Sequence, residues 1–129
     1  MRLYYSDTFE LPLPDNHRFP MAKYTLLRER IASGELSEHC QLEIPPSSTD
    51  EEILLAHTPE YLDQMKTGSL SELQIKRIGF PWSEAMVERS RRSTGATIQA
   101  ARSAIELGIS ANLAGGTHHA FADLSLIHI

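Results

Sequence analysis

The alternation of apolar and polar positions along the chain predicts an α/β protein. Residues 2–5 form a short β-prone run, and residues 40–44 alternate before two prolines, as a short strand does. Residues 109–114 read as a buried strand that follows a helix and a glycine turn. Between these strands the apolar spacing is helical. Helix starts are predicted after Pro20, Thr49, Thr58 and Ser83.

The longest predicted helix is Glu84–Leu107, which Gly108 ends. Residues spaced three, four or seven positions apart form an apolar stripe, which is expected to face the core. A ridge of alanines beside it would allow close packing. The arginines fall mostly on the other side, where a solvated face is the ordinary interpretation. The stripe is Val87, Thr94, Ile98, Ala101 and Ile105, the ridge is Ala96, Ala100 and Ala104, and the arginines are Arg89, Arg91 and Arg92.

Composition narrows the class of protein. A length of 129 residues suggests one domain or part of one, and 41% hydrophobic residues is ordinary for a globular core. The net charge of −5 gives no basis for nucleic-acid binding, and no apolar run reaches the ~20 residues of a membrane span. Acidic residues interrupt any signal-peptide core, and the single cysteine, Cys40, fits a reducing compartment. We therefore expect a cytoplasmic protein without nucleic-acid or membrane partners.

Two adjacent histidines follow the last predicted strand. His118 and His119 come after Gly115 and Gly116, and ligands of open α/β sheets bind beyond the carboxyl ends of strands. In an irregular loop, unlike in a strand, neighbouring side chains can converge on one substrate. One imidazole could then act as a general base while the other stabilises charge, because histidine titrates near neutral pH. A metal site and a pair of incidental loop histidines are the other interpretations that local chemistry leaves open.

Four segments together resemble the histone deacetylase superfamily. Residues 113–123, Leu-Ala-Gly-Gly-Thr-His-His-Ala-Phe-Ala-Asp, resemble its histidine-dyad motif. Residues 15–24 resemble the N-terminal motif of bacterial deacetylase-like proteins, and residues 56–62 resemble the family's His-Thr-x-x-Tyr-Leu segment. Residues 77–83 and the arginine-rich helix after them are most similar to the class IV branch. The segments keep the family's order over residues 1–123, and their combination is highly specific.

This resemblance implies a fold, a reaction and a site. The fold would be an incomplete three-layer α/β/α arrangement of the deacetylase/arginase type with a mostly parallel sheet. The reaction would be hydrolysis of acetyl-lysine or related acylated amines with one zinc ion. His119 would act as general base and then general acid, His118 would assist electrostatically, and His57 is interpreted as structural because it precedes a helix cap away from the dyad motif. The substrate or product channel would be lined by Arg18, Gly115 and Gly116.

The resemblance also implies parts that follow the dyad in the family. Its zinc ligands, an Asp-x-His pair and a later Asp, lie downstream, as do the carboxylates that orient the histidines and the tyrosine that polarises the substrate carbonyl. We therefore expect residues 1–123 to be the N-terminal part of a deacetylase-like domain, inactive as given and without zinc. Residues 124–129 can be encoded by CTG TCT CTT ATA CAC ATC, the transposase end sequence used to tag DNA for sequencing. We interpret them as a non-native, adapter-encoded tail.

Two classes of function stay open. One is an enzyme fragment, the amino-terminal part of a zinc-dependent deacylase. The other is a noncatalytic binding or interaction domain derived from the same fold. An Asp-x-His codon pattern downstream of Asp123 in the parent DNA would favour the enzyme. An arginase-like metallohydrolase is a third and weaker alternative, because that family shares the architecture but the Gly-Gly-Thr-His-His order argues against it.

Overall fold

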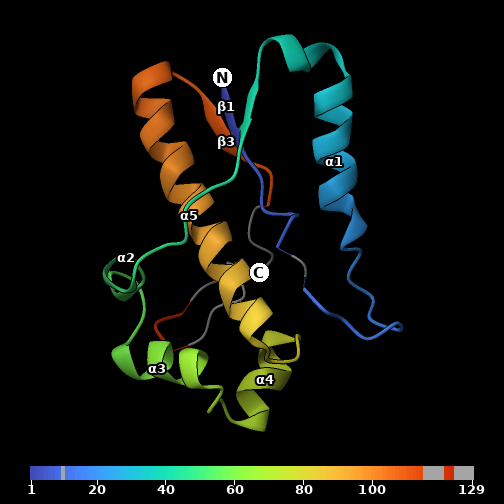
Figure 1. Ribbon diagram of the computed structural model, residues 1–129. Coiled ribbons are helices and arrows are strands. Elements are labelled where there is room, and N and C mark those ends of the chain that lie inside the picture. The colour runs from blue at the N-terminus through green and yellow to red at the C-terminus, as the bar shows by residue number, and fades with distance from the viewer. Residues whose placement is uncertain (10, 115–120, 124–129) are drawn as a thin grey trace.

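The computed structural model describes residues 1–9, 11–114 and 121–123. Within them, three parallel strands lie side by side in the order β2-β1-β3, and helices lie on both sides of the strands (Figure 1). The α/β class and the parallel sheet expected from the sequence are confirmed. In chain order the elements are β1 (Arg2–Tyr4), α1 (Ala22–Ser33), a 3-10 turn η1 (Glu35–Glu38), β2 (Gln41–Glu43), α2 (Asp50–Leu54), α3 (Pro59–Thr67), α4 (Glu72–Ile78), α5 (Glu84–Leu107) and β3 (Ser110–Asn112).

The strand β1 is the centre of this sheet. Leu3 lies opposite Leu42 of β2 and Ala111 of β3, and Leu3 itself is buried. Parallel strands need long crossovers: α1 lies in the connection from β1 to its neighbour β2, and α2–α5 lie in the connection from β2 to β3, which pairs with the other side of β1. In Figure 1, α5 and α1 lie on opposite sides of the strands, as expected for a sheet that is covered on both faces.

Local capping chemistry determines where the helices begin. The side chain of Thr49 accepts a hydrogen bond from the Glu52 amide at 3.2 Å, and the Glu52 carboxylate accepts one from the Thr49 amide at 3.0 Å. This confirms the capping box predicted for α2. The predicted caps of α3 and α5, Thr58 and Ser83, are confirmed in the same way, and α5 has the predicted bounds. The helix α4 was not predicted, although it also carries a capping box, from Ser71 to Gln74.

The face of α5 that packs on the sheet differs from the prediction. Ile105, placed on the buried stripe, is 87% exposed, and Ala101 is exposed as well. The buried face instead follows small residues, because Tyr4 of β1 packs closely against Ala96 and Ala100. The hydroxyl of Tyr4 also shares a 2.8 Å hydrogen bond with Ser103. Because α5 and β1 approach each other closely, small side chains occupy the buried face of α5 in place of large apolar ones.

The arginines of α5 also differ from the prediction of a solvated face. Arg89 is 1% exposed, and the side chains of Arg91 and Arg92 are 17% and 26% exposed. Each guanidinium donates to backbone carbonyls of segments that cross the helix. These arginines connect α5 to the loop after β1 and to the segment between β2 and α2.

A second apolar cluster lies beyond the sheet, around α3, α4 and the start of α5. It is built from large side chains and receives the loop that precedes α1. Its buried members are Leu11, Tyr61, Leu70, Ile78, Phe80 and Met86.

Candidate functional site

The predicted dyad, His118 and His119, lies outside the described residues, as do the predicted channel residues Gly115 and Gly116. On the two sides of the dyad, the structure describes the chain as far as Ala114 and then Phe121, Ala122 and Asp123. It therefore describes the two ends of the predicted catalytic segment and what holds each of them.

The incoming end is held by α5. Ser93, buried in α5, donates a 2.7 Å hydrogen bond to the carbonyl of Ala114. Asn112, the last residue of β3, donates from its amide nitrogen to the Ser93 carbonyl and to the Thr97 hydroxyl, both at 3.0 Å. The Asn112 side-chain oxygen accepts from the Ala114 amide at 2.9 Å. The backbone entering the segment is thus held by the side chains of Ser93 and Asn112, and Thr97 helps to orient Asn112.

The outgoing end is held at the N-terminus of α3. Nδ1 of His57 lies 2.9 Å from the carbonyl oxygen of Phe121, and the Thr58 amide donates to the Ala122 carbonyl at 2.8 Å. His57 is 7% exposed, and its ring centroid lies 5.4 Å from that of Tyr61. The expectation that His57 lies away from the dyad motif is wrong, because the chain folds the end of that motif back onto it.

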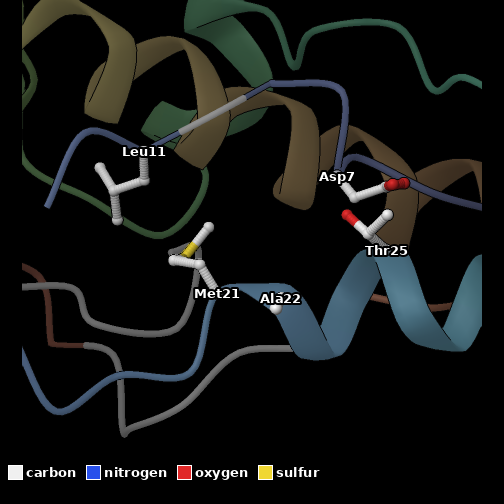
Figure 2. A pocket seen from close by; sticks show the side chains of 5 residues that line it. All are labelled: Asp7, Leu11, Met21, Ala22 and Thr25. Carbon is white, nitrogen blue, oxygen red and sulfur yellow. The ribbon is translucent and has the colours of Figure 1, made fainter.

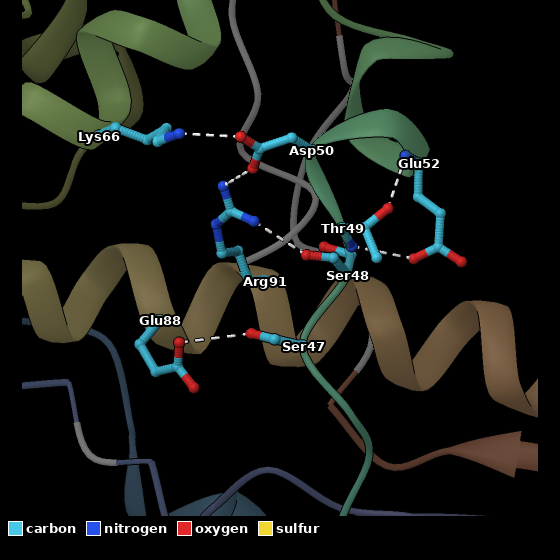
Figure 3. Close-up of polar contacts among 8 residues, drawn as sticks. All are labelled: Ser47, Ser48, Thr49, Asp50, Glu52, Lys66, Glu88 and Arg91. Atoms are coloured by element: carbon cyan, nitrogen blue, oxygen red, sulfur yellow. Dashed lines mark hydrogen bonds and ion pairs between the residues drawn. The ribbon is translucent and has the colours of Figure 1, made fainter.

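The segment that leads to His57 is tied to α5 by a group of polar side chains (Figure 3). Asp50, at the start of α2, accepts from Lys66 of α3 at 2.8 Å and forms an ion pair with Arg91 of α5. The hydrogen bonds from Lys66 and then Arg91 lower the pKa of Asp50 from 3.8 to about 2. Arg91 also donates to the Ser48 carbonyl at 2.9 Å. The segment that holds Phe121 is therefore attached to α5, the helix whose Ser93 holds Ala114.

Arg18 lies in the N-terminal motif, and its side chain is exposed. Its neighbours anchor the motif. The His17 ring stacks on Phe80 with centroids 5.2 Å apart, and Phe19 contacts the same ring edge-on. Since the Phe19 amide donates to Nδ1 of His17, the hydrogen of this imidazole is on Nε2, which donates to the Gly79 carbonyl at 3.1 Å. The N-terminal motif thus packs against the motif of residues 77–83.

A cavity of about 270 Å³ lies beside the N-terminal motif (Figure 2). One carboxylate, that of Asp7, lines this cavity. It already forms an ion pair with Arg28, whose Nε lies 2.8 Å from Asp7 Oδ2. The pairing raises the pKa of Arg28, chiefly through its hydrogen bond to Asp7. The lining is Asp7, Leu11, Met21, Ala22 and Thr25.

The described residues do not fit a zinc site. Among them, no group of three or more His, Cys, Asp or Glu side chains is placed to hold a metal ion. A zinc site needs at least three such ligands around one point.

In the same described part of the chain, no helix is long and apolar enough to cross a bilayer.

Sequence reasoning missed Ser93 and Asn112, which hold the incoming end of the dyad segment. Ser93 carries a weak signal, because it is a small polar residue on the side of α5 that is rich in alanine and glycine. Asn112 has a clearer one, since an asparagine at the end of a strand often bonds the backbone two residues on.

Comparison with known proteins identifies the family to which this chain belongs. The family model described as histone deacetylase domain matches residues 17–125. The chain therefore belongs to the histone deacetylase family.

Individual relatives agree with this assignment. The chain is 37% identical to an uncharacterized protein of Picosynechococcus sp. over 91% of its own length and 39% of that protein. It is 27% identical to histone deacetylase 2 of Arabidopsis thaliana, over 85% of the chain and 33% of the plant protein. A crystal structure of an HDAC homolog complexed with SAHA matches 99% of the chain with a TM-score of 0.71 and 26% identity. The chain spans about a third to two fifths of each of these proteins, including 37% of the HDAC homolog.

Proposed function

We propose that this chain is the N-terminal part of a zinc-dependent deacylase that hydrolyses acetyl-lysine or related acylated amines. The histone deacetylase domain match is the observation that carries the proposal, because it runs through the whole dyad segment. The described frame supports it. Ser93 and Asn112 at one end, with His57 and Thr58 at the other, would give a general base a fixed position.

In this proposal the two histidines have different tasks. His119 takes a proton from the water that attacks the amide carbonyl and later delivers a proton to the leaving amine as the C–N bond breaks. His118 stabilises the charge that develops between these steps. Arg18, Gly115 and Gly116 line the channel through which substrate or product passes. General acid–base catalysis is typically worth ~10²–10⁴ in rate, so loss of His119 costs more than loss of His118.

Zinc belongs to the longer protein in this proposal. When bound, the ion supplies a Lewis acid and an activated water. Its ligands would be the Asp-x-His pair and the later Asp that the family resemblance implies, and the described residues do not replace them. The chain of 129 residues is therefore proposed to be inactive by itself.

The ligand would be an acylated lysine or an acylated amine. The SAHA complex of the HDAC homolog supports a small-molecule site within the same fold. The proposal includes no nucleic-acid or membrane partner. The half-buried, unpaired thiol of Cys40 is compatible with the reducing cytoplasm that we propose as its location.

The test is an assay of the full reading frame from the source organism. We expect acyl-lysine hydrolysis that stops when a chelator removes zinc, falls ~10²-fold or more in His119→Ala, and falls less in His118→Ala. His39→Ala, at an exposed position in the same chain, is the matched control and should keep full turnover. Turnover is corrected for the folded fraction. A folded full-length protein without hydrolysis of any acyl-lysine tried would favour the noncatalytic binding domain instead.

A further inference from the structure

His57 and Thr58 together hold two consecutive carbonyls of a segment about 64 positions further along the chain. The first bond runs from Nδ1 of His57 to the Phe121 oxygen at 2.9 Å, and the second from the Thr58 amide to the Ala122 oxygen at 2.8 Å. We call these two bonds the 57–58 clamp. A two-point attachment fixes both the position and the direction of the chain that it holds.

The first bond also determines the protonation of the ring. A carbonyl oxygen only accepts hydrogen bonds, so Nδ1 of His57 must carry a hydrogen. In the neutral imidazole, Nε2 is then the basic nitrogen. His17 has the opposite arrangement, because its Nδ1 accepts from the Phe19 amide. The two histidines should therefore give different nitrogen signatures in the same molecule.

The clamp stands on a helix that is itself well anchored. Thr58 is the N-cap of α3, and its hydroxyl accepts from the Tyr61 amide at 3.2 Å. Lys66, in the last turn of α3, bonds to Asp50, which also pairs with Arg91 of α5. His57 is thus held relative to α5, the helix whose Ser93 holds the other end of the dyad segment.

We propose that His57 is a positioning residue, which holds Phe121 through its Nδ1–H and so fixes the outgoing end of the segment that carries His119 in the sequence. The effect on turnover rests on the proposed function, whereas the clamp itself does not. Catalysis is sensitive to such placement, because a shift of about 1 Å in a reacting group can cost ~10²-fold in rate. A residue that only fills space would have no need of a donor at Nδ1.

The first experiment measures the clamp in the 129-residue chain. Long-range ¹H–¹⁵N spectra should show the neutral His57 ring protonated on Nδ1 and the His17 ring protonated on Nε2. A neutral His57 ring protonated on Nε2 would overturn the proposal without any variant.

Matched variants separate the donor from packing. In His57→Asn the side-chain amide can donate from the place of Nδ1, whereas His57→Leu keeps the bulk and removes the donor. Hydrogen exchange followed by mass spectrometry should show faster exchange of the Thr58 amide in the leucine variant and near-wild-type exchange in the asparagine variant. Thr58→Ala removes the cap of α3 and keeps the backbone N–H, so it should lower stability and leave the clamp in place. Equal protection in the leucine and asparagine variants would contradict a role for the donor.

The second experiment measures turnover in the longer protein. We expect kcat to fall roughly tenfold or more in His57→Leu with KM nearly unchanged, and to be largely restored in His57→Asn. Equal loss in both variants would show a packing role and overturn the proposal. If the longer protein has no deacylase activity while the nitrogen and exchange results hold, the proposed function fails and the clamp stands.

Discussion

At the scale of single residues, Arg89 shows how a charge can belong to the core. Its Nη1 donates to the carbonyls of Ser6 at 2.9 Å and Phe9 at 2.7 Å, and the guanidinium lies 4.8 Å from the centre of the Tyr24 ring. Burial lowers its pKa, but an arginine starts so high that the group stays charged at neutral pH. The side chain therefore donates hydrogen bonds to two backbone carbonyls of the irregular segment that follows β1.

Asp50 gives a prediction about acid stability. The pKa of its carboxyl is about 2 in the folded protein against 3.8 normally, so between these values the unfolded state binds more protons. Its contribution to stability is complete above about pH 4 and is lost as the pH falls toward 2. Asp50→Asn should therefore unfold with a shallower dependence on pH in this window than the wild type. Urea unfolding at several pH values measures the slope.

The control for this experiment is Glu29→Gln, which removes the same charge from an exposed position of α1. It should keep the wild-type slope between pH 4 and 2. Some slope should also remain in Asp50→Asn, because the backbone at the start of α2 lowers the pKa of Glu51. Identical slopes in the wild type and Asp50→Asn would show that the links to Lys66 and Arg91 do not stabilise the folded state.

What the sequence predicts at this scale depends on how far away the partner is. Thr49, Thr58 and Ser83 were predicted as caps, because a cap bonds an amide two or three residues ahead. The hydrogen bonds of Arg89 and Ser93 were not predicted, because their partners are distant in the sequence. Arg89 bonds residues 80 to 83 positions away, and Ser93 bonds Ala114, 21 positions away. A pattern of charges cannot show which backbone carbonyls the fold will leave unpaired.

At the scale of elements, the packing of α5 is determined by the segment of residues 45–48, which crosses the helix very closely. The Ser48 amide donates to the Arg91 carbonyl at 3.0 Å, and Arg92 donates to the Pro45 carbonyl at 2.8 Å. Gly95 lies beneath this crossing. A Cβ placed on it would overlap the Pro46 carbonyl oxygen and lie 3.1 Å from the Ser48 nitrogen.

Gly95→Ala should consequently destabilise the protein. In an open helix, alanine gains about 1 kcal/mol over glycine, so the ordinary expectation has the opposite sign. Here the new methyl group meets backbone, which cannot rotate away, and we expect a net loss of about 3 kcal/mol. Chemical denaturation compared with Gln99→Ala, at another position of α5, gives the measurement. An alanine variant as stable as the wild type would mean that the crossing is wider than the structure shows.

The extent of α5 could be predicted, but its buried face could not. Its two ends are defined locally, by the Ser83 cap and by Gly108 with a φ of 82°. Its buried face depends on what packs there, and the strand β1 and the crossing at Gly95 favour small residues. Ile105 fits the helical period but is exposed to solvent. A periodic pattern predicts which residues share a face of the helix, but not which element packs against that face.

At the scale of the whole molecule, the family resemblance predicted more than the local patterns did. Local patterns gave three strands but neither their order nor their parallel pairing, which are set by contacts such as Leu3 with Leu42 and Ala111. The resemblance supplied the parallel sheet, and the family match supports it. The dyad itself lies outside the described residues, so its roles remain predictions, whereas its two anchoring points are described.

The whole molecule also leaves apolar side chains exposed where α5 meets β3. Ile105 is 87% exposed, Leu107 is 49% exposed and Ile109 is 61% exposed, and all three lie within five positions of one another. Neighbouring exposed apolar residues of this kind mark interaction surfaces or aggregation sites. We define these three residues as the α5–β3 patch.

We expect the purified 129-residue chain to form oligomers through the α5–β3 patch, to an extent that grows with concentration. The double variant Ile105→Lys/Ile109→Lys should shift the population toward monomer in sedimentation velocity. Leu26→Lys/Leu55→Lys is the matched control, since it makes the same change at exposed leucines on α1 and after α2. Both variants bring the net charge of −5 closer to zero, so charge repulsion cannot explain a shift toward monomer. A wild-type chain that stays monomeric at every concentration, or equal shifts in both variants, would show that the patch drives no association.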